Sequence, residues 1–125
     1  HFSFGSRLFS ILFGVSGLFA MGVAAFPGDA GTMHGLVALG WFTTAPLSAI
    51  VSSRMVKGPL ACFSPAIGIF SLVVLFFAFY SGTASPFQLF GRGGEERMLV
   101  YPVILWMTAL AGYLMASRRT DGQDV

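Results

Sequence analysis

A short turn near residue 30 brings together two side chains that can exchange protons. Asp29 supplies a carboxylate, and His34 supplies an imidazole five positions later. In the first turn of a helix, the positive end of the helix dipole favours neutral imidazole, whereas a nearby carboxylate favours imidazolium. These opposed effects suit a proton acceptor, so His34 is a candidate catalytic base with Asp29 as its orienting partner. The structural alternative is that Asp29 caps the helix or binds water, and that His34 anchors at the headgroup level of a membrane.

A second polar cluster occupies residues 91–97, directly before an apolar run. Glu95 and Glu96 suit the start of a helix, whereas Arg97 opposes the helix dipole and needs a carboxylate or a lipid phosphate as its partner. We expect this cluster to meet the turn at Asp29, with Asp29 and Arg97 within reach of a salt bridge or of one bridging water. The alternative is a purely structural ion-pair clamp between two loops. The predicted ligand-binding set is Asp29, His34, Glu96, Arg97 and Tyr101.

Several other chemistries have weak support. A metal site would have to combine Asp29, His34 and a glutamate, and Cys62 is the only cysteine, so neither a metal nor a cofactor is predicted. The glycine-rich residues 91–94 lack the lysine and the spacing of a nucleotide phosphate loop. No serine or cysteine has a recognisable base partner in the sequence. The sequence therefore favours a protein that is not an enzyme.

The elements that must position these residues are long apolar runs. Residues 58–91 carry no formal charge over 34 positions, and residues 8–28, 30–53 and 98–117 are likewise uncharged apart from His34. The chain is 55% hydrophobic and 10% charged, whereas a soluble domain is roughly a quarter charged. A helix of about 20 apolar residues spans a bilayer and satisfies its own backbone hydrogen bonds. The sequence thus predicts an all-α, multi-pass protein of the cell membrane.

Prolines and glycines divide the chain into four predicted spans, at residues 8–26, 34–53, 61–81 and 98–117, which form one bundle over residues 1–125. Pro27-Gly28 ends the first span, and Gly58-Pro59 separates the second from the third. The short connections predict an up-down-up-down arrangement. Pro46 interrupts the second span and frees a carbonyl there, which we expect Thr43 or Thr44 to satisfy in part.

The basic residues predict the orientation of the bundle. The net charge of +2 would suggest a nucleic-acid partner in a soluble protein, but five of the seven basic residues fall at one end of the predicted spans, so no such partner is expected. Cytoplasmic loops are rich in lysine and arginine, so both termini are predicted to be cytoplasmic, and the two polar clusters extracytoplasmic. The five residues at the basic end are Arg7, Arg54, Lys57, Arg118 and Arg119.

Small side chains recur at four-residue spacing on each predicted span. Such residues let helix backbones approach closely in a membrane, where apolar burial contributes little to association. We expect them to face neighbouring helices. The sets are Ser16/Ala20/Ala24, Thr44/Ser48/Ser52, Ser64/Gly68 and Thr108/Gly112/Ala116.

The turn Phe26-Pro-Gly-Asp-Ala-Gly-Thr-Met-His-Gly35 and the helix start Glu96-Arg-Met-Leu-Val-Tyr-Pro102 are two moderately specific motifs. With Gly17-Leu-Phe and Gly112-Tyr-Leu, they resemble the later part of an archaeal and bacterial membrane protein family called domain of unknown function 998. The family turn often carries Glu where this chain has Gly28, which weakens a shared acid–base or metal role. The resemblance implies a polytopic protein of about six spans, of which two would precede this chain, and it brings no established activity.

Three functions remain open on the sequence. The leading one is an integral membrane protein of uncharacterised role that binds a lipid headgroup, an ion or a proton at its extracytoplasmic polar cluster, with membrane lipids as partners. The second is a lipid-directed enzyme with His34 as base, Asp29 orienting it and Arg97 holding a phosphate. The third is a transporter or an accessory subunit, acting as a homo-oligomer or in a larger membrane assembly. For transport, the sequence offers only Thr43, Thr44, Ser71 and Thr108 at mid-membrane depth.

Overall fold

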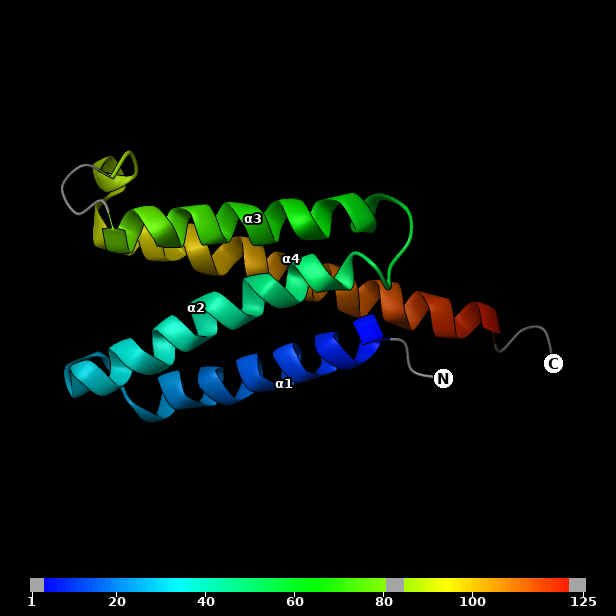
Figure 1. Cartoon of the computed structure of the whole chain (residues 1–125), viewed down its shortest axis with the longest axis horizontal. Coiled ribbons are helices and arrows are strands. Elements are labelled where there is room, and N and C mark those ends of the chain that lie inside the picture. The colour runs from blue at the N-terminus through cyan, green and yellow to red at the C-terminus, as the bar shows by residue number, and fades with distance from the viewer. Residues whose placement is uncertain (1–3, 81–84, 122–125) are drawn as a thin grey trace.

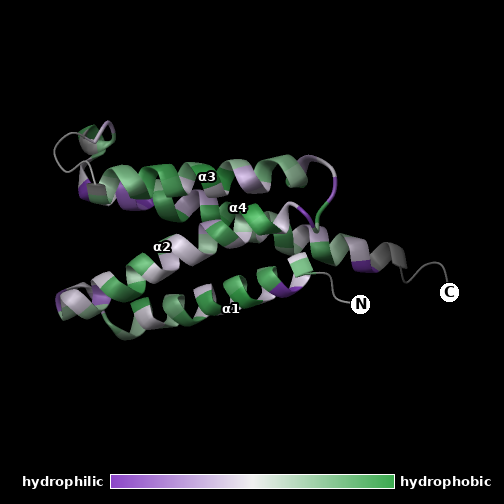
Figure 2. Ribbon diagram, viewed as in Figure 1, coloured by the Kyte–Doolittle hydropathy of each residue, from purple (hydrophilic) through white to green (hydrophobic). Residues whose placement is uncertain are grey.

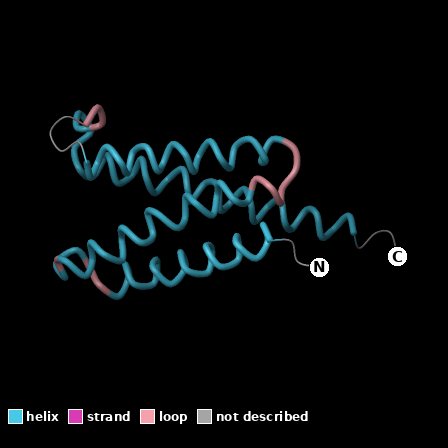
Figure 3. Tube along the Cα trace, viewed as in Figure 1, coloured by secondary structure: helices cyan, strands magenta, loops and turns pink. Residues whose placement is uncertain are grey.

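The apolar runs fold into four long helices, which confirms the all-α fold expected from the sequence. The structure is a computed structural model, and it describes residues 4–80 and 85–121. All four helices are long and apolar enough to cross a membrane. Figure 3 shows that little of the described chain lies outside them. In chain order the elements are α1 (Phe4–Ala25), the 3-10 turn η1 (Gly28–Ala30), α2 (Thr32–Ser52), α3 (Pro59–Tyr80), the 3-10 turn η3 (Gln88–Phe90) and α4 (Gly91–Asp121).

The fourth helix differs most from the predicted span. It begins at Gly91, seven residues before Met98, so residues 91–97 form two helical turns rather than a loop. Gly91 has a φ of 67°, in the left-handed region that favours glycine, and it joins η3 to α4. A helix pairs its own backbone groups in water as well as in lipid, so a polar segment can continue a membrane helix beyond the hydrocarbon. Glu95 and Glu96 consequently lie in the second turn of α4, beyond the stretch where the helix dipole acts strongly.

Consecutive helices run in opposite directions, with α2 at the centre of the bundle. Figure 1 shows the α1–α2 turn and the α3–α4 connection at one end, while the α2–α3 connection and both described chain ends lie at the other. Helix α2 packs against α1, α3 and α4. Colouring by hydropathy shows apolar helix bodies, with hydrophilic residues gathered mainly near their ends (Figure 2). The two predicted polar clusters therefore lie at the same end of the bundle.

The small residues have unequal roles. Ser16, Ser48 and Ser64 are buried. At Gly68, α3 approaches α2 so closely that an added Cβ would lie 2.5 Å from the carbonyl oxygen of Pro46. Ala20 and Ala24 on α1 are exposed, however, and so are Thr108, Gly112 and Ala116 on α4. For these residues the expectation that they are buried against a neighbouring helix was wrong.

Two further close approaches were not predicted. They lie between α1 and α2, where Gly22 faces Val37 and Gly40 faces the ring of Phe19. Here one glycine on each helix receives a large side chain of the other. This pattern is not a small-residue repeat along one helix, which explains why four-residue spacing did not reveal it.

The largest buried side chain, Trp106, joins all four helices. It is fully buried, and its indole N–H donates a hydrogen bond to Ser64 Oγ of α3 over 3.1 Å. Its ring meets that of Phe13 on α1 edge-on, with centroids 6.2 Å apart. Ala45 and Ala49 of α2 belong to the same core cluster. Trp106 is therefore a packing residue at the centre of the bundle.

The hydroxyls of Thr43 and Thr44 do not satisfy the carbonyl freed by Pro46. A proline at position 46 removes the helical donor to the carbonyl of residue 42. Thr43 donates to the Leu39 carbonyl and Thr44 to the Gly40 carbonyl, over 2.8 and 2.7 Å. Each hydroxyl bonds the carbonyl four residues before it, the usual reach of a helical threonine, so the expected compensation at residue 42 was wrong.

Most of the helix surface is apolar and exposed. Ser16 is the only buried residue of α1, whereas Ile11, Leu18 and Met21 are each more than 60% exposed. Apolar surface of this extent is incompatible with water as the only solvent but suits lipid. The chain is therefore described as a multi-pass membrane protein.

Candidate functional site

His34 is held by the end of the preceding helix. Its Nδ1 lies 2.7 Å from the carbonyl oxygen of Phe26, at the point where the chain leaves α1. A carbonyl can only accept a hydrogen bond, so Nδ1 must carry a hydrogen. In neutral imidazole, Nε2 is then the unprotonated nitrogen. His34 thus closes the α1–α2 turn and retains one nitrogen that can accept a proton or a hydrogen bond.

This contact predicts a local effect of mutation. His34→Ala should remove the hydrogen bond to Phe26 and lower the free energy of unfolding by about 1 kcal/mol. Amide hydrogen exchange should accelerate in residues 28–33, because the turn loses its tie to α1. Thr32→Ala is the matched control, because α2 has Gly31 as its N-cap and no side-chain capping bond there. Equal exchange in the two variants would contradict the role of His34 in closing the turn.

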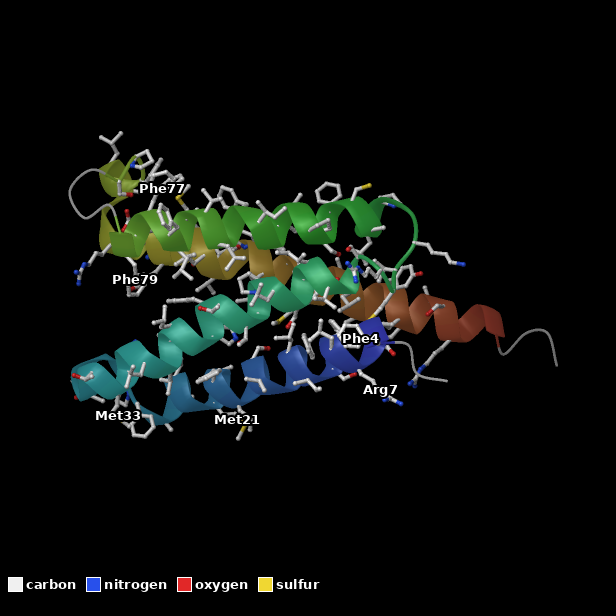
Figure 4. All side chains as sticks on the ribbon, in the orientation of Figure 1. Phe4, Arg7, Met21, Met33, Phe77 and Phe79 are labelled. Atoms are coloured by element: carbon white, nitrogen blue, oxygen red, sulfur yellow. The ribbon has the colours of Figure 1, made fainter. Side chains whose placement is uncertain are left out.

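A groove of about 830 Å³ lies beside His34, between the α1–α2 hairpin and the α3–α4 hairpin. Figure 4 shows Phe79 of α3 at this end of the molecule, where the two hairpins separate, while Arg7 lies at the opposite end. The lining is polar where α2 and α4 begin and apolar farther along the helices. Its polar or charged members are His34, Arg92, Glu95 and Glu96, and its apolar members are Ala20, Val23, Ala38, Leu39, Trp41, Phe42, Ala78, Phe79, Leu99, Val100 and Ile104, with Gly35.

The charged side chains of the groove come from the first two turns of α4. Arg92, Glu95 and Glu96 are three and four positions apart, so they share one face of the helix. Glu95 is fixed from outside the helix, because its Oε1 accepts a hydrogen bond of 2.9 Å from Ser85 Oγ. The Ser85 hydroxyl oxygen in turn accepts from the amide of Phe87. This network ties the segment before α4 to the groove wall.

The predicted ligand-binding set divides into two groups. His34 and Glu96 line the groove, whereas Asp29, Arg97 and Tyr101 do not. Asp29 lies in η1 and is exposed. Arg97 and Tyr101 are exposed on another face of α4, four residues apart. Within the described parts of the chain, Asp29 and Arg97 form no direct ion pair, and the atom that orients the His34 ring through Nδ1 is the Phe26 carbonyl rather than Asp29.

Arg92 and Glu95 are groove residues that the predicted set lacked. Their spacing carries the signal, since residues 92, 95, 96, 99 and 100 form one helical stripe. The stripe can be recognised only when the helix starts at Gly91. The predicted span starts at Met98 and leaves Arg92 and Glu95 in a loop, where no shared face can be assigned.

The mid-membrane hydroxyls lie outside this groove. Thr43, Thr44 and Thr108 each donate to a carbonyl of their own helix. Ser71 is fully buried in α3, and its Oγ has no hydrogen-bond partner among the described residues. None of the four contributes to the groove lining. Over residues 4–80 and 85–121, no group of three His, Cys, Asp or Glu side chains could hold a metal ion.

Comparison with known proteins gives a family but no activity. No curated protein and no solved structure matches the chain. The model of one protein family matches residues 3–113, which is most of the sequence. The matched region includes all of α1, α2 and α3, together with the groove-lining part of α4. The chain therefore belongs to the family described as protein of unknown function DUF998.

Proposed function

We propose that this membrane protein binds a zwitterionic phospholipid, with the headgroup at the polar mouth of the groove between the two hairpins. The single observation that carries the proposal is the composition of this groove. One arginine, two glutamates and a histidine share a cavity whose other walls are apolar. By the distribution of basic residues, this mouth lies on the extracytoplasmic side of the cell membrane.

The charges of the mouth match a headgroup that carries both signs. Arg92 offers a planar set of donors suited to phosphate oxygens. Glu95 and Glu96 supply carboxylates for an ammonium group, and charge-assisted bonds of this kind are about twice as strong as neutral ones. A purely anionic ligand would meet two carboxylates, and a simple cation would meet Arg92. Phosphoethanolamine satisfies both groups.

The apolar part of the groove suits an acyl chain. From His34 to Phe42 the lining follows α2 for eight residues, which corresponds to about 12 Å of helix. Phe79 of α3 and Ile104 of α4 contribute apolar side chains to the same cavity. A lipid can therefore place its headgroup at the polar end and a chain along the helices. An isolated ion or proton would use only the polar end.

Lipid retention tests the proposal. The protein should be delipidated, mixed with equal amounts of phosphatidylethanolamine and phosphatidylglycerol, and analysed by native mass spectrometry. The wild type should retain phosphatidylethanolamine. Arg92→Ala should weaken its retention about tenfold, because a charge-assisted hydrogen bond to phosphate is lost. The double variant Glu95→Gln/Glu96→Gln should lower the retained ratio of phosphatidylethanolamine to phosphatidylglycerol.

Arg97→Ala is the matched control, because it removes an exposed arginine of the same helix that does not line the groove. It should leave retention unchanged. Equal losses in Arg92→Ala and Arg97→Ala would mean that surface charge, rather than the groove, attracts the lipid. A wild-type protein that retains no phosphatidylethanolamine would overturn the proposal.

A further inference from the structure

A second groove lies at the opposite end of the bundle, between α3 and α4. It has a volume of about 620 Å³ and shares no lining residue with the first. Leu60, Phe63 and Ile67 line it from α3, and Leu105 and Ala109 from α4. From Leu60 to Ile67 this wall follows about 10 Å of helix. The proposed function described above uses none of these residues.

The polar groups at the mouth of this groove are hydrogen-bond donors. The backbone amide of Lys57 donates to the hydroxyl oxygen of Tyr113 over 3.1 Å. This bond uses the oxygen of Tyr113 as acceptor and leaves the hydroxyl hydrogen available, since no described residue accepts it. Lys57 is exposed and belongs to the residues that line the same groove. A basic residue and a phenolic O–H therefore lie next to each other where α3 begins, with the Lys57 backbone in direct contact with Tyr113.

The charged side chains that the structure describes at this end are all basic. Arg7, Arg54 and Arg118 are exposed near it, in addition to Lys57. Among the side chains that the structure describes, the carboxylates of Asp29, Glu95 and Glu96 all belong to the other end. By the lysine and arginine bias, this end faces the cytoplasm, where the membrane leaflet is rich in anionic lipid.

We propose that the α3–α4 groove is a binding site for one anionic phospholipid of the cytoplasmic leaflet. Its phosphate binds the Lys57 ammonium and the Tyr113 hydroxyl, and an acyl chain follows Leu60, Phe63 and Ile67 toward Trp106. Charge complementarity selects this occupant, because Lys57 is basic, the Tyr113 hydroxyl can donate, and no lining residue of this groove carries a carboxylate. The site is independent of the proposed zwitterionic lipid site, which has carboxylates at its mouth and opens at the other end.

The test compares the retention of phosphatidylglycerol and phosphatidylcholine with matched acyl chains, measured by native mass spectrometry of the delipidated full chain. Lys57→Gln should lower the retained ratio of phosphatidylglycerol to phosphatidylcholine about fivefold, as expected for one basic residue at an anionic surface. Tyr113→Phe should lower it in the same direction. Ala109→Trp fills the groove from its α4 wall and should lower the retention of phosphatidylglycerol without removing any charge.

Arg7→Gln is the matched control, since it removes one positive charge at the same end without touching the groove. Its ratio should stay within about twofold of the wild type, because exposed charges at a distance are screened by salt. Equal losses in Lys57→Gln and Arg7→Gln would overturn the proposal in favour of general surface attraction. A dimer in the mass spectrum that Ala109→Trp abolishes would overturn it in favour of a second copy as occupant. These variants leave His34, Arg92, Glu95 and Glu96 intact. An absence of anionic lipid binding at the second groove can therefore be distinguished from an absence of zwitterionic lipid binding at the first.

Discussion

Truncating Trp106 to alanine is expected to lower the free energy of unfolding by about 3 kcal/mol. In a membrane, the unfolded reference helix already lies in hydrocarbon, so little of this cost comes from transfer out of water. The cost comes from the packing lost among α1, α2 and α3, where Trp106 is fully buried in one core cluster with Ala45 and Ala49. The measurement is unfolding of the purified protein in mixed micelles with increasing dodecyl sulfate, followed by far-UV circular dichroism.

Leu105→Ala is the control for this prediction. Leu105 precedes Trp106 on α4 and is 68% exposed, so its truncation leaves space that lipid or detergent fills. Trp106→Phe separates the two contributions of the indole, because it keeps an aromatic ring but removes the bond to Ser64. That variant should lose about 1 kcal/mol, since the Ser64 hydroxyl keeps its bond to the Leu60 carbonyl. A loss in Leu105→Ala as large as in Trp106→Ala would show that Trp106 has no special place in the packing.

Replacing Gly68 with alanine is expected to lower the free energy of unfolding by about 2 kcal/mol. The added Cβ would lie 2.5 Å from the Pro46 carbonyl oxygen and 2.6 Å from Ile50 Cγ1, so α2 and α3 must move apart. The oxygen is a backbone atom that cannot rotate away as a side chain would. The same dodecyl sulfate titration measures the change.

Gly112→Ala is the matched control for Gly68→Ala. Gly112 also lies within a membrane helix, but a Cβ there would meet nothing within 4 Å. Alanine is the better helix former by about 1 kcal/mol, so Gly112→Ala should be neutral or stabilising. The two substitutions are chemically identical, and any difference between them reports the contact between helices. Equal stability of the two variants would contradict the close approach of α2 and α3.

The number and type of the helices were predictable because the bilayer restricts the choice. An uncharged run of 34 residues such as 58–91 has few ways to pair its backbone in lipid other than as a helix. The breaks at Pro27 and Pro59 also lie where expected, since a proline lacks the donor that continues a helix. The start of α4 was not predictable from hydropathy, because its first seven residues are polar and extend the helix beyond the apolar run.

The candidate site was predicted in part. His34 and Glu96 line the first groove, because both follow short polar segments at the same end of the bundle. The exclusion of Arg97 and Tyr101 depends on helix rotation, whereas Asp29 lies in η1, before α2 begins. Each position on a helix is turned about 100° from the last, so Arg97 points away from the face that Glu96 shares with Arg92.

By itself, the sequence determined that this is a multi-pass membrane protein with four apolar helices and that its charges gather at the helix ends. These properties follow from the composition of continuous segments. The free energy of transferring a residue into lipid depends on its own side chain and not on which distant residues it packs against. Only the tertiary structure decided which small residues meet, which face of α4 lines a groove, and that Trp106 joins the helices. Those features depend on how each helix is rotated about its axis relative to its neighbours. This rotation is set by close packing between side chains that are far apart in the chain.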